Sequence, residues 1–152
     1  MNTTINPDQV VELAFGSAYT ITSSKITSLD ILTAETRYLL PIVGEELYAA
    51  ILAGDYGALK EEYVAPLVAA WTRYLVEPQI PERCGSDTRG DFTEADYMLN
   101  SNIIRRLKVS ASTLSRRLTN YLNAHAAEFE EYNPNNNPLN HCVMYGGVVQ
   151  VY

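Results

Sequence analysis

The sequence predicts a mainly α-helical protein: a bundle of four to six helices, with one long helix in the C-terminal half and a small C-terminal β-hairpin. Apolar residues recur every three or four positions through most of the chain, which is the period of an amphipathic helix. Glycine and proline residues divide this pattern into segments. At 152 residues the chain is expected to form a single domain, residues 1–152, in which residues 133–152 are a Pro/Asn-rich linker and a hairpin tail.

The N-terminal part predicts a short helix followed by an extended segment. Asn6 is a suitable N-cap, Pro7 suits the first helical position, and Gly16 ends the helix after about Phe15. Residues 17–27 are rich in β-branched and hydroxyl side chains. This composition predicts an extended connector or a short strand.

Two shorter helices come next. The first begins at a cap formed by Thr27 or Ser28 and is ended or kinked by Pro41, which lacks a backbone donor. The second covers residues 45–52 and ends at Gly54.

A longer helical region runs from Gly57 to about Glu77 and is split or bent at Pro66. Its apolar positions extend so far around the helix axis that burial on more than one side is expected. We therefore expect it to be the central core helix. Residues 80–92 follow as a loop.

The longest predicted helix covers residues 93–131, about 55 Å if unbroken at 1.5 Å per residue. Thr93 and Asp96 resemble an N-terminal capping box. The apolar seam of this helix occupies about a third of its circumference. It consists of Ile104, Leu107, Ala111, Leu114, Leu118, Tyr121, Leu122, His125 and Phe129.

The C-terminal tail is expected to differ from the rest. The segment 132–138, with its prolines and asparagines, breaks the helix, and residues 142–152 are expected to form a hairpin around Gly146-Gly147. A two-stranded hairpin is marginal alone in water. We therefore expect it to lie on the helices or to pair with a strand of a neighbouring chain.

Composition excludes several classes of protein. No apolar run is long enough to span a membrane, and the N-terminus lacks the features of a secretion signal. Two cysteines, Cys84 and Cys142, do not make a disulfide framework, so reduced cytosolic thiols are expected. A formal charge of −7 disfavours general nucleic-acid binding. This charge is uneven, because residues 1–81 carry −6 and residues 82–152 carry −1.

No catalytic motif, cofactor-binding loop or metal-site spacing is present, so we expect no enzyme activity, no cofactor and no metal. His125 lies on the apolar seam, where a satisfied, partly buried imidazole is expected. A zinc site from Cys84, His125, His141 and Cys142 is disfavoured by the spacing. Adjacent acids such as Glu45-Glu46, Glu61-Glu62 and Glu130-Glu131 diverge by about 100° on a helix and indicate solvated surface. Ser112 and Ser115 are expected to be surface residues.

One polar feature suggests a function. Arg105, Arg106, Arg116 and Arg117 project opposite to the apolar seam, and no acid occurs between Tyr97 and Ala127. They form either a solvated helix face or a docking surface for an acid-rich protein. Because the first half of the chain is acidic, a head-to-tail contact between copies is possible, and such a contact can close into a ring.

Three stretches carry a resemblance to a known family. They are Ile31–Tyr48 (ILTAETRYLLPIVGEELY), Glu62–Trp71 (EYVAPLVAAW) and Tyr121–Phe129 (YLNAHAAEF) with the following Tyr132-Asn-Pro. Their layout over residues 25–135 resembles the small head–tail connector, or adaptor, proteins of tailed phages and prophages of Bacteroides-like bacteria. The resemblance implies a helical, non-enzymatic protein that assembles as a ring between portal and tail, with net acidity suited to a channel through which DNA slides.

The expected function is therefore structural. The resemblance implies a virion protein, present in the host cytoplasm during assembly, whose partners are copies of itself and portal or tail proteins. No membrane and no sequence-specific nucleic acid is expected as a partner. The alternative is a small helical protein- or DNA-binding regulatory module of a mobile element.

Overall fold

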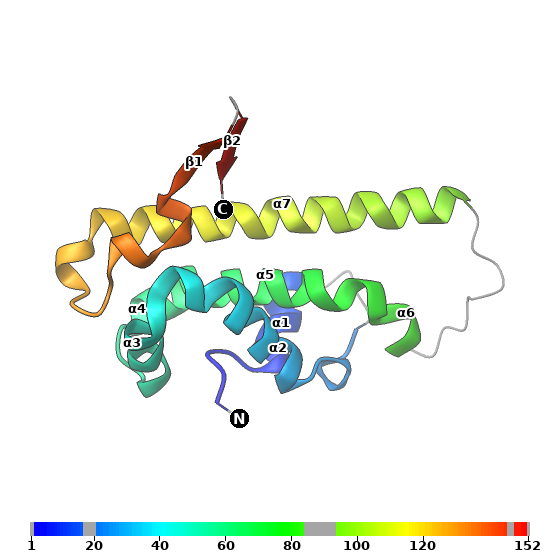
Figure 1. The fold of residues 1–152 in the computed structure, drawn as a ribbon. Coiled ribbons are helices and arrows are strands. Elements are labelled where there is room, and N and C mark those ends of the chain that lie inside the picture. Colours follow the sequence, from blue (N-terminus) through cyan, green and yellow to red (C-terminus); the bar gives the residue numbers. More distant parts are fainter. Residues whose placement is uncertain (1, 17–20, 84–93, 146–147, 152) are drawn as a thin grey trace.

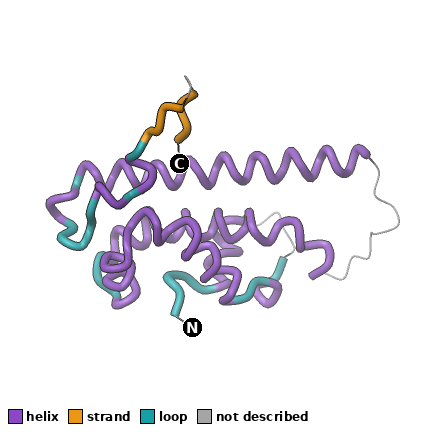
Figure 2. Tube along the Cα trace, viewed as in Figure 1, coloured by secondary structure: helices purple, strands orange, loops and turns teal. Residues whose placement is uncertain are grey.

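The computed structural model describes residues 2–16, 21–83, 94–145 and 148–151. These residues are mainly helical, and one long helix occupies the C-terminal half, as predicted (Figure 1; Figure 2). This helix, α7 (Glu94–Ala124), lies along one side of the molecule, and α5 (Ala65–Val76) runs beside it in the opposite direction. Helices α1 (Pro7–Val10) and α2 (Ser28–Ala34) contact α5 from other sides.

The first helix begins as the sequence predicts. Asn6 and Gln9 form a reciprocal capping box, with both side-chain to backbone hydrogen bonds at 2.9 Å. After α1 the helix widens into a π-helical turn, η1 (Val11–Phe15), and ends at Gly16. Of the segment predicted as extended, residues 17–20 lie outside the described residues. The strand prediction is wrong for the rest, because Ser23–Lys25 form a 3₁₀ turn, η2, between extended Thr22 and Ile26.

The break after the second helix lies at Gly44 and not at Pro41. Thr27 caps α2 through a capping box with Asp30. The chain then continues through a π-helical turn, η3 (Glu35–Leu39), into α3 (Leu40–Ala53). Gly44 has φ 79° and ψ 165°, a conformation that is essentially confined to glycine. Gly54, with φ 101°, ends α3 as predicted.

A short motif repeats at the two prolines of this region. Tyr38-x-x-Pro41-x-Val43 and Tyr63-x-x-Pro66-x-Val68 share the same spacing. In both cases a π-helical turn, η3 or η4 (Lys60–Val64), ends two residues before the proline. A wider turn moves the carbonyl of residue i−4 away from the proline ring, so each helix passes its proline without ending. Pro66 therefore leaves α4 (Gly57–Leu59), η4 and α5 as one continuous helical region.

Helix α5 is the central core helix that the sequence predicts. It contacts α1, η1, α2, η3 and α7. Its buried positions extend around much of the helix: Ala65, Leu67, Val68, Ala69, Trp71, Thr72 and Val76. Burial on several sides is what its wide apolar pattern required.

The segment predicted as a loop begins with helix. A 3₁₀ turn, η5 (Glu77–Gln79), leads into α6 (Ile80–Arg83). Proline suits the first turn of a helix, and Pro81 lies there. The Arg83 guanidinium donates to both oxygens of Asp30 on α2, at 2.7 and 2.9 Å, which fixes the turn against the body. The remainder of that loop and the predicted Thr93 cap lie outside the described residues.

The long helix ends at Ala124, seven residues before the predicted end at Glu131. His125 leaves the helical conformation, and a 3₁₀ turn, η6 (Ala126–Glu128), follows. This turn brings Phe129 back to the core, where it packs edge-on against Tyr56 at 5.0 Å between ring centroids. The packing of the Phe129 ring therefore outweighs the helical propensity of residues 125–128.

The tail folds back along the end of α7. Two 3₁₀ turns, η7 (Pro134–Asn136) and η8 (Pro138–Asn140), are joined by Asn137, which is fully buried and hydrogen-bonds to Thr119 and Tyr132. Strands β1 (Cys142–Tyr145) and β2 (Val148–Val151) then pair antiparallel. The predicted Gly146-Gly147 turn lies outside the described residues. No helix in the described ranges combines the length and apolarity needed to cross a bilayer.

Candidate docking surface

The outward face of α7 carries both cations and apolar side chains. Arg105, Arg106 and Arg116 are exposed, as predicted. Val109 is 60% exposed, although it lies one helical turn from Arg105 and Arg106 and is apolar. Asn102, Arg105, Arg106, Val109 and Ser110 together line a shallow hollow of about 460 Å³. We call Arg105, Arg106 and Val109 the basic face.

Arg117 also makes a contact that the sequence analysis did not predict. Its guanidinium lies over the ring of Tyr63, 4.6 Å from the centroid, in a cation–π contact across the α7–η4 interface. Tyr63 in turn stacks on Tyr121 at 4.2 Å. Arg117 is exposed like the other three arginines, but its guanidinium also contacts this aromatic pair.

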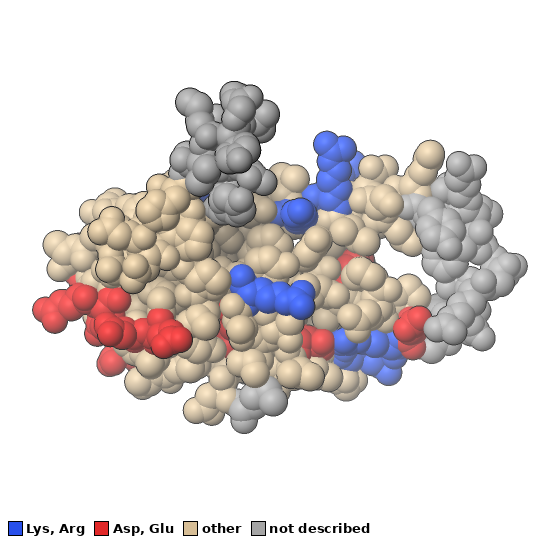
Figure 3. All heavy atoms as spheres, in the orientation of Figure 1, with Lys and Arg blue, Asp and Glu red and all other residues tan. Residues whose placement is uncertain are grey.

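Four cations of α7 form no salt bridge with any acid that the structure describes. No acid in the described part of the chain forms a salt bridge with Arg105, Arg106, Lys108 or Arg116. The space-filling view shows the largest group of acids at the end of the molecule formed by α3 and the turn after α7, and smaller groups elsewhere (Figure 3). Arg105 and Arg106 lie in the half of α7 that is further from this largest group.

Several acids make up that end. One hollow of about 400 Å³ lies at α3, next to the kink at Gly44, and is lined by Glu45, Glu46 and Glu131. Tyr56 donates to Glu131 at 2.8 Å, and this hydrogen bond, with burial and the nearby Asp55 and Glu130, raises the pKa of Tyr56. We call Glu45, Glu46, Asp55, Glu130 and Glu131 the acidic end. Glu45, Glu46 and Glu130 are exposed, as predicted for solvated acids, whereas Glu131 is half-buried.

The first half of α7 is only partly covered by the body. Its seam positions Ile103, Ile104 and Leu107 are half-buried, whereas Ala111, Leu118 and Leu122 further along are fully buried. A groove of about 390 Å³ separates Ile103 and Ile104 from Ile80 and Pro81 of α6. The opening between these two layers is visible in Figure 3. Met98 and Leu99, both at least 60% exposed, add apolar surface to the same half of α7.

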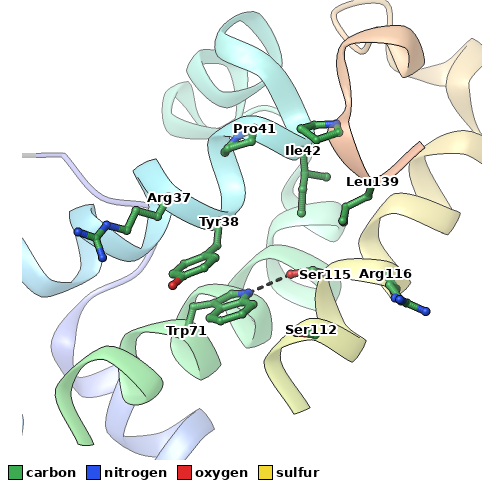
Figure 4. Close-up of a pocket in the computed structure, with 10 residues that line it drawn as sticks. Arg37, Tyr38, Pro41, Ile42, Trp71, Ser112, Ser115, Arg116 and Leu139 are labelled. Carbon is green, nitrogen blue, oxygen red and sulfur yellow. Dashed lines mark hydrogen bonds between the residues drawn. The ribbon is translucent and has the colours of Figure 1, made fainter. Parts of the chain in front are cut away.

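Another hollow, of about 340 Å³, lies between α7, α5 and the η3–α3 segment (Figure 4). Tyr38 stacks on Trp71 with 3.7 Å between ring centroids and forms one wall, and burial raises the pKa of Tyr38. Arg37 and Arg116 line the rim, but their side chains point away from the centre. The other lining residues are Pro41, Ile42, Ser112, Ser115, Pro138 and Leu139. This lining holds no carboxylate, imidazole or thiol, so it offers no acid–base pair.

Ser115 is not the surface residue that was expected. It is 7% exposed and accepts a hydrogen bond from the Trp71 indole nitrogen at 2.9 Å, which joins α5 to α7. Ser112 is half-buried at the cleft. A serine one turn from a seam alanine, facing the only tryptophan of the chain, is the signal that could have identified this bond.

The sequence analysis also missed a buried carboxylate. Glu35 is fully buried in η3 and accepts hydrogen bonds from the Thr4 amide at 2.6 Å, the Thr4 hydroxyl at 2.5 Å and the Tyr48 hydroxyl at 2.7 Å. Burial, together with the hydrogen bond to Glu35, raises the pKa of Tyr48. All three donors are fixed by the fold, so Glu35 secures the N-terminal segment to α3.

His125 is half-buried, and its Nδ1 lies 3.0 Å from the Tyr121 carbonyl, as expected for a satisfied imidazole on the seam. Within the described ranges no three His, Cys, Asp or Glu residues are grouped so that they could hold a metal ion. Cys84 lies outside those ranges. The only hollow described above with several carboxylates is at the acidic end, where Glu45 and Glu46 are exposed and no imidazole lines the site.

Comparison with known proteins found no matching family model, no matching curated protein and no matching solved structure. Function is therefore argued from the surfaces described above.

Proposed function

We propose that this chain is a structural protein of a phage or prophage particle: a head–tail connector, or adaptor, that self-assembles and docks to portal or tail proteins. The observation that carries the proposal is the first half of α7, where cations that form no salt bridge with any described acid lie beside exposed apolar side chains. Exposed apolar surface next to arginine is typical of surfaces that bind another protein. Such a chain works in the particle and is made in the host cytoplasm.

A non-enzymatic role agrees with the described hollows. The cleft beside Trp71 lacks titratable groups other than Tyr38 and two arginines that point away from it. Acid–base catalysis needs at least two titratable groups converging on one substrate position. We propose that these hollows receive side chains of neighbouring proteins.

The helical bundle is proposed as the assembling unit, and the strand pair as an additional contact. Within the described residues β1 and β2 pair only with each other. Each strand therefore has one open edge, to which a strand from a neighbouring chain can add. This hairpin was expected from the sequence to seek such a partner.

A second candidate function is a small helical protein- or DNA-binding regulatory module of a mobile element. It is favoured by the five cations of α7, Arg105, Arg106, Lys108, Arg116 and Arg117, in a stretch without acids. It is opposed by the net charge of −7, because phosphate binding needs a positive surface. Retention on double-stranded DNA at moderate salt, lost when Arg105, Arg106 and Arg116 are changed to Glu, would favour this candidate.

Electron microscopy of the purified protein tests the connector directly. We expect closed rings that become more abundant as the protein concentration rises, either for the protein alone or after a portal protein of the same phage is added. Binding to DNA with no ring in either sample would refute the connector in favour of the regulatory module.

A further inference from the structure

The basic face of α7 and the acidic end beyond Ala124 define a contact between copies. We propose that the basic face of one copy, Arg105, Arg106 and Val109, docks on the acidic end of a second copy of this chain. This inference names a partner surface for the self-assembly proposed above and in that sense rests on it. The occupant is chosen by charge: the surface that complements the basic face is present on the same chain.

The two surfaces cannot neutralise each other within one copy. Nineteen residues separate Arg105 from the end of α7 at Ala124, which is about 29 Å of helix at 1.5 Å per residue. The acidic end lies just beyond that point, where Tyr56 holds Glu131 and packs on Phe129. The charges are thus separated by about three Debye lengths at physiological salt, so each surface is free to attract a separate molecule.

The contact joins different surfaces of the two copies. A heterologous contact of this kind repeats from copy to copy and gives a ring when the rotation closes. In this contact the hollow lined by Glu45, Glu46 and Glu131 receives the arginine side chains. The exposed Pro41, which also lines this hollow, offers apolar surface for Val109 of the docked copy. One exposed ion pair contributes little to affinity, so the proposal requires both arginines and the apolar contact together.

DNA is disfavoured as the occupant of the basic face. The acidic end belongs to the same rigid helical body, and the chain carries −7 overall. A polyanion that approaches Arg105 and Arg106 is repelled by that net charge at longer range. The acidic end of another copy brings negative charge together with an apolar rim, which matches the composition of the basic face.

Charge reversal followed by mixing tests the contact. Variant A carries Arg105→Glu and Arg106→Glu, and variant B carries Glu45→Lys and Glu46→Lys. Each variant alone presents like charges at the contact, so sedimentation velocity should show its apparent dissociation constant raised by at least about 100-fold, since like-charge juxtaposition is strongly unfavourable. In an equal mixture, copies of A and B that alternate present opposite charges at every contact, so the mixture should regain association.

A matched control changes the same amount of charge elsewhere. Asp8→Lys with Glu12→Lys alters two exposed acids on α1 and η1, away from both surfaces, and should leave assembly within about threefold of wild type. Circular dichroism establishes that all variants are folded. The contact is refuted if A and B assemble alone like the wild type, if folded A and B fail to assemble when mixed, or if the wild type stays a single copy from micromolar to millimolar concentration. Rings that form despite A and B leave the connector function in place and overturn only this contact.

Discussion

Replacement of Glu35 by Leu should destabilise the fold strongly. Leu has nearly the same volume but cannot accept the hydrogen bonds of the Thr4 amide, the Thr4 hydroxyl and the Tyr48 hydroxyl. Thr4 is 2% exposed, so water does not reach its donors. A buried donor left unpaired costs about 1–3 kcal/mol. Two such donors on Thr4, with a smaller term from half-buried Tyr48, give an expected loss of about 3–5 kcal/mol.

Glu35→Gln serves as the matched control. Its amide oxygen can accept both Thr4 hydrogen bonds, and its amide nitrogen can donate to the Tyr48 hydroxyl. Only the extra strength of bonds to a charged acceptor is lost, so we expect a decrease of about 1–2 kcal/mol. The difference in free energy of unfolding between the two variants measures the cost of the unsatisfied donors separately from the cost of losing the charge.

Urea denaturation followed by far-UV circular dichroism measures both effects. In thermal unfolding of a chain of this length, 1 kcal/mol corresponds to about 2–4 °C in Tm, so the Tm of the Leu variant should be about 10 °C lower. Adding Thr4→Val to Glu35→Leu should recover part of the loss, because it removes one of the unpaired donors. A Glu35→Leu variant as stable as the wild type would show that Glu35 does not secure the N-terminal segment.

Three further predictions concern stability. Trp71→Phe removes the hydrogen bond to Ser115 and should lower the free energy of unfolding, measured in urea, by about 2 kcal/mol. Ser115→Ala should lower it by about 1–2 kcal/mol. An unchanged free energy of unfolding in either variant would contradict a stabilising role of this hydrogen bond. Gly44→Ala meets no neighbouring atom within 4 Å, so its cost of about 1–3 kcal/mol should come from the backbone alone. The raised pKa of Tyr48 stabilises the protein fully below pH about 10, and this contribution should fall as pH rises further. Tyr48→Phe should make alkaline unfolding less steep, and an unchanged pH profile would contradict this.

Local signals predicted the helices and several of their ends correctly. The caps at Asn6 and Thr27 and the stop at Gly54 depend on neighbouring residues only, so they can be identified without the fold. The periodic apolar positions of α5 identified the core helix for the same reason. The repeated Tyr-x-x-Pro-x-Val motif was also available in the sequence and would have indicated that Pro41 and Pro66 do not end their helices.

Long-range contacts decided what the sequence could not predict. Phe129 returns to Tyr56, 73 residues earlier, and so ends α7 at Ala124. Glu35 is buried only because Thr4 and Tyr48 surround it. In the candidate surface, helical geometry placed Arg105, Arg106 and Arg116 correctly on the exposed face. Arg117 is exposed as well, but its contact with Tyr63 could not be predicted, because that ring belongs to another helix.

If this chain is a structural component of a phage particle, as we propose, quantitative mass spectrometry of particles purified from the host strain should detect it. We expect peptides of this chain at a fixed copy number per particle, in a constant ratio to the portal protein. Particles that contain portal and tail proteins but none of this chain would contradict the proposal.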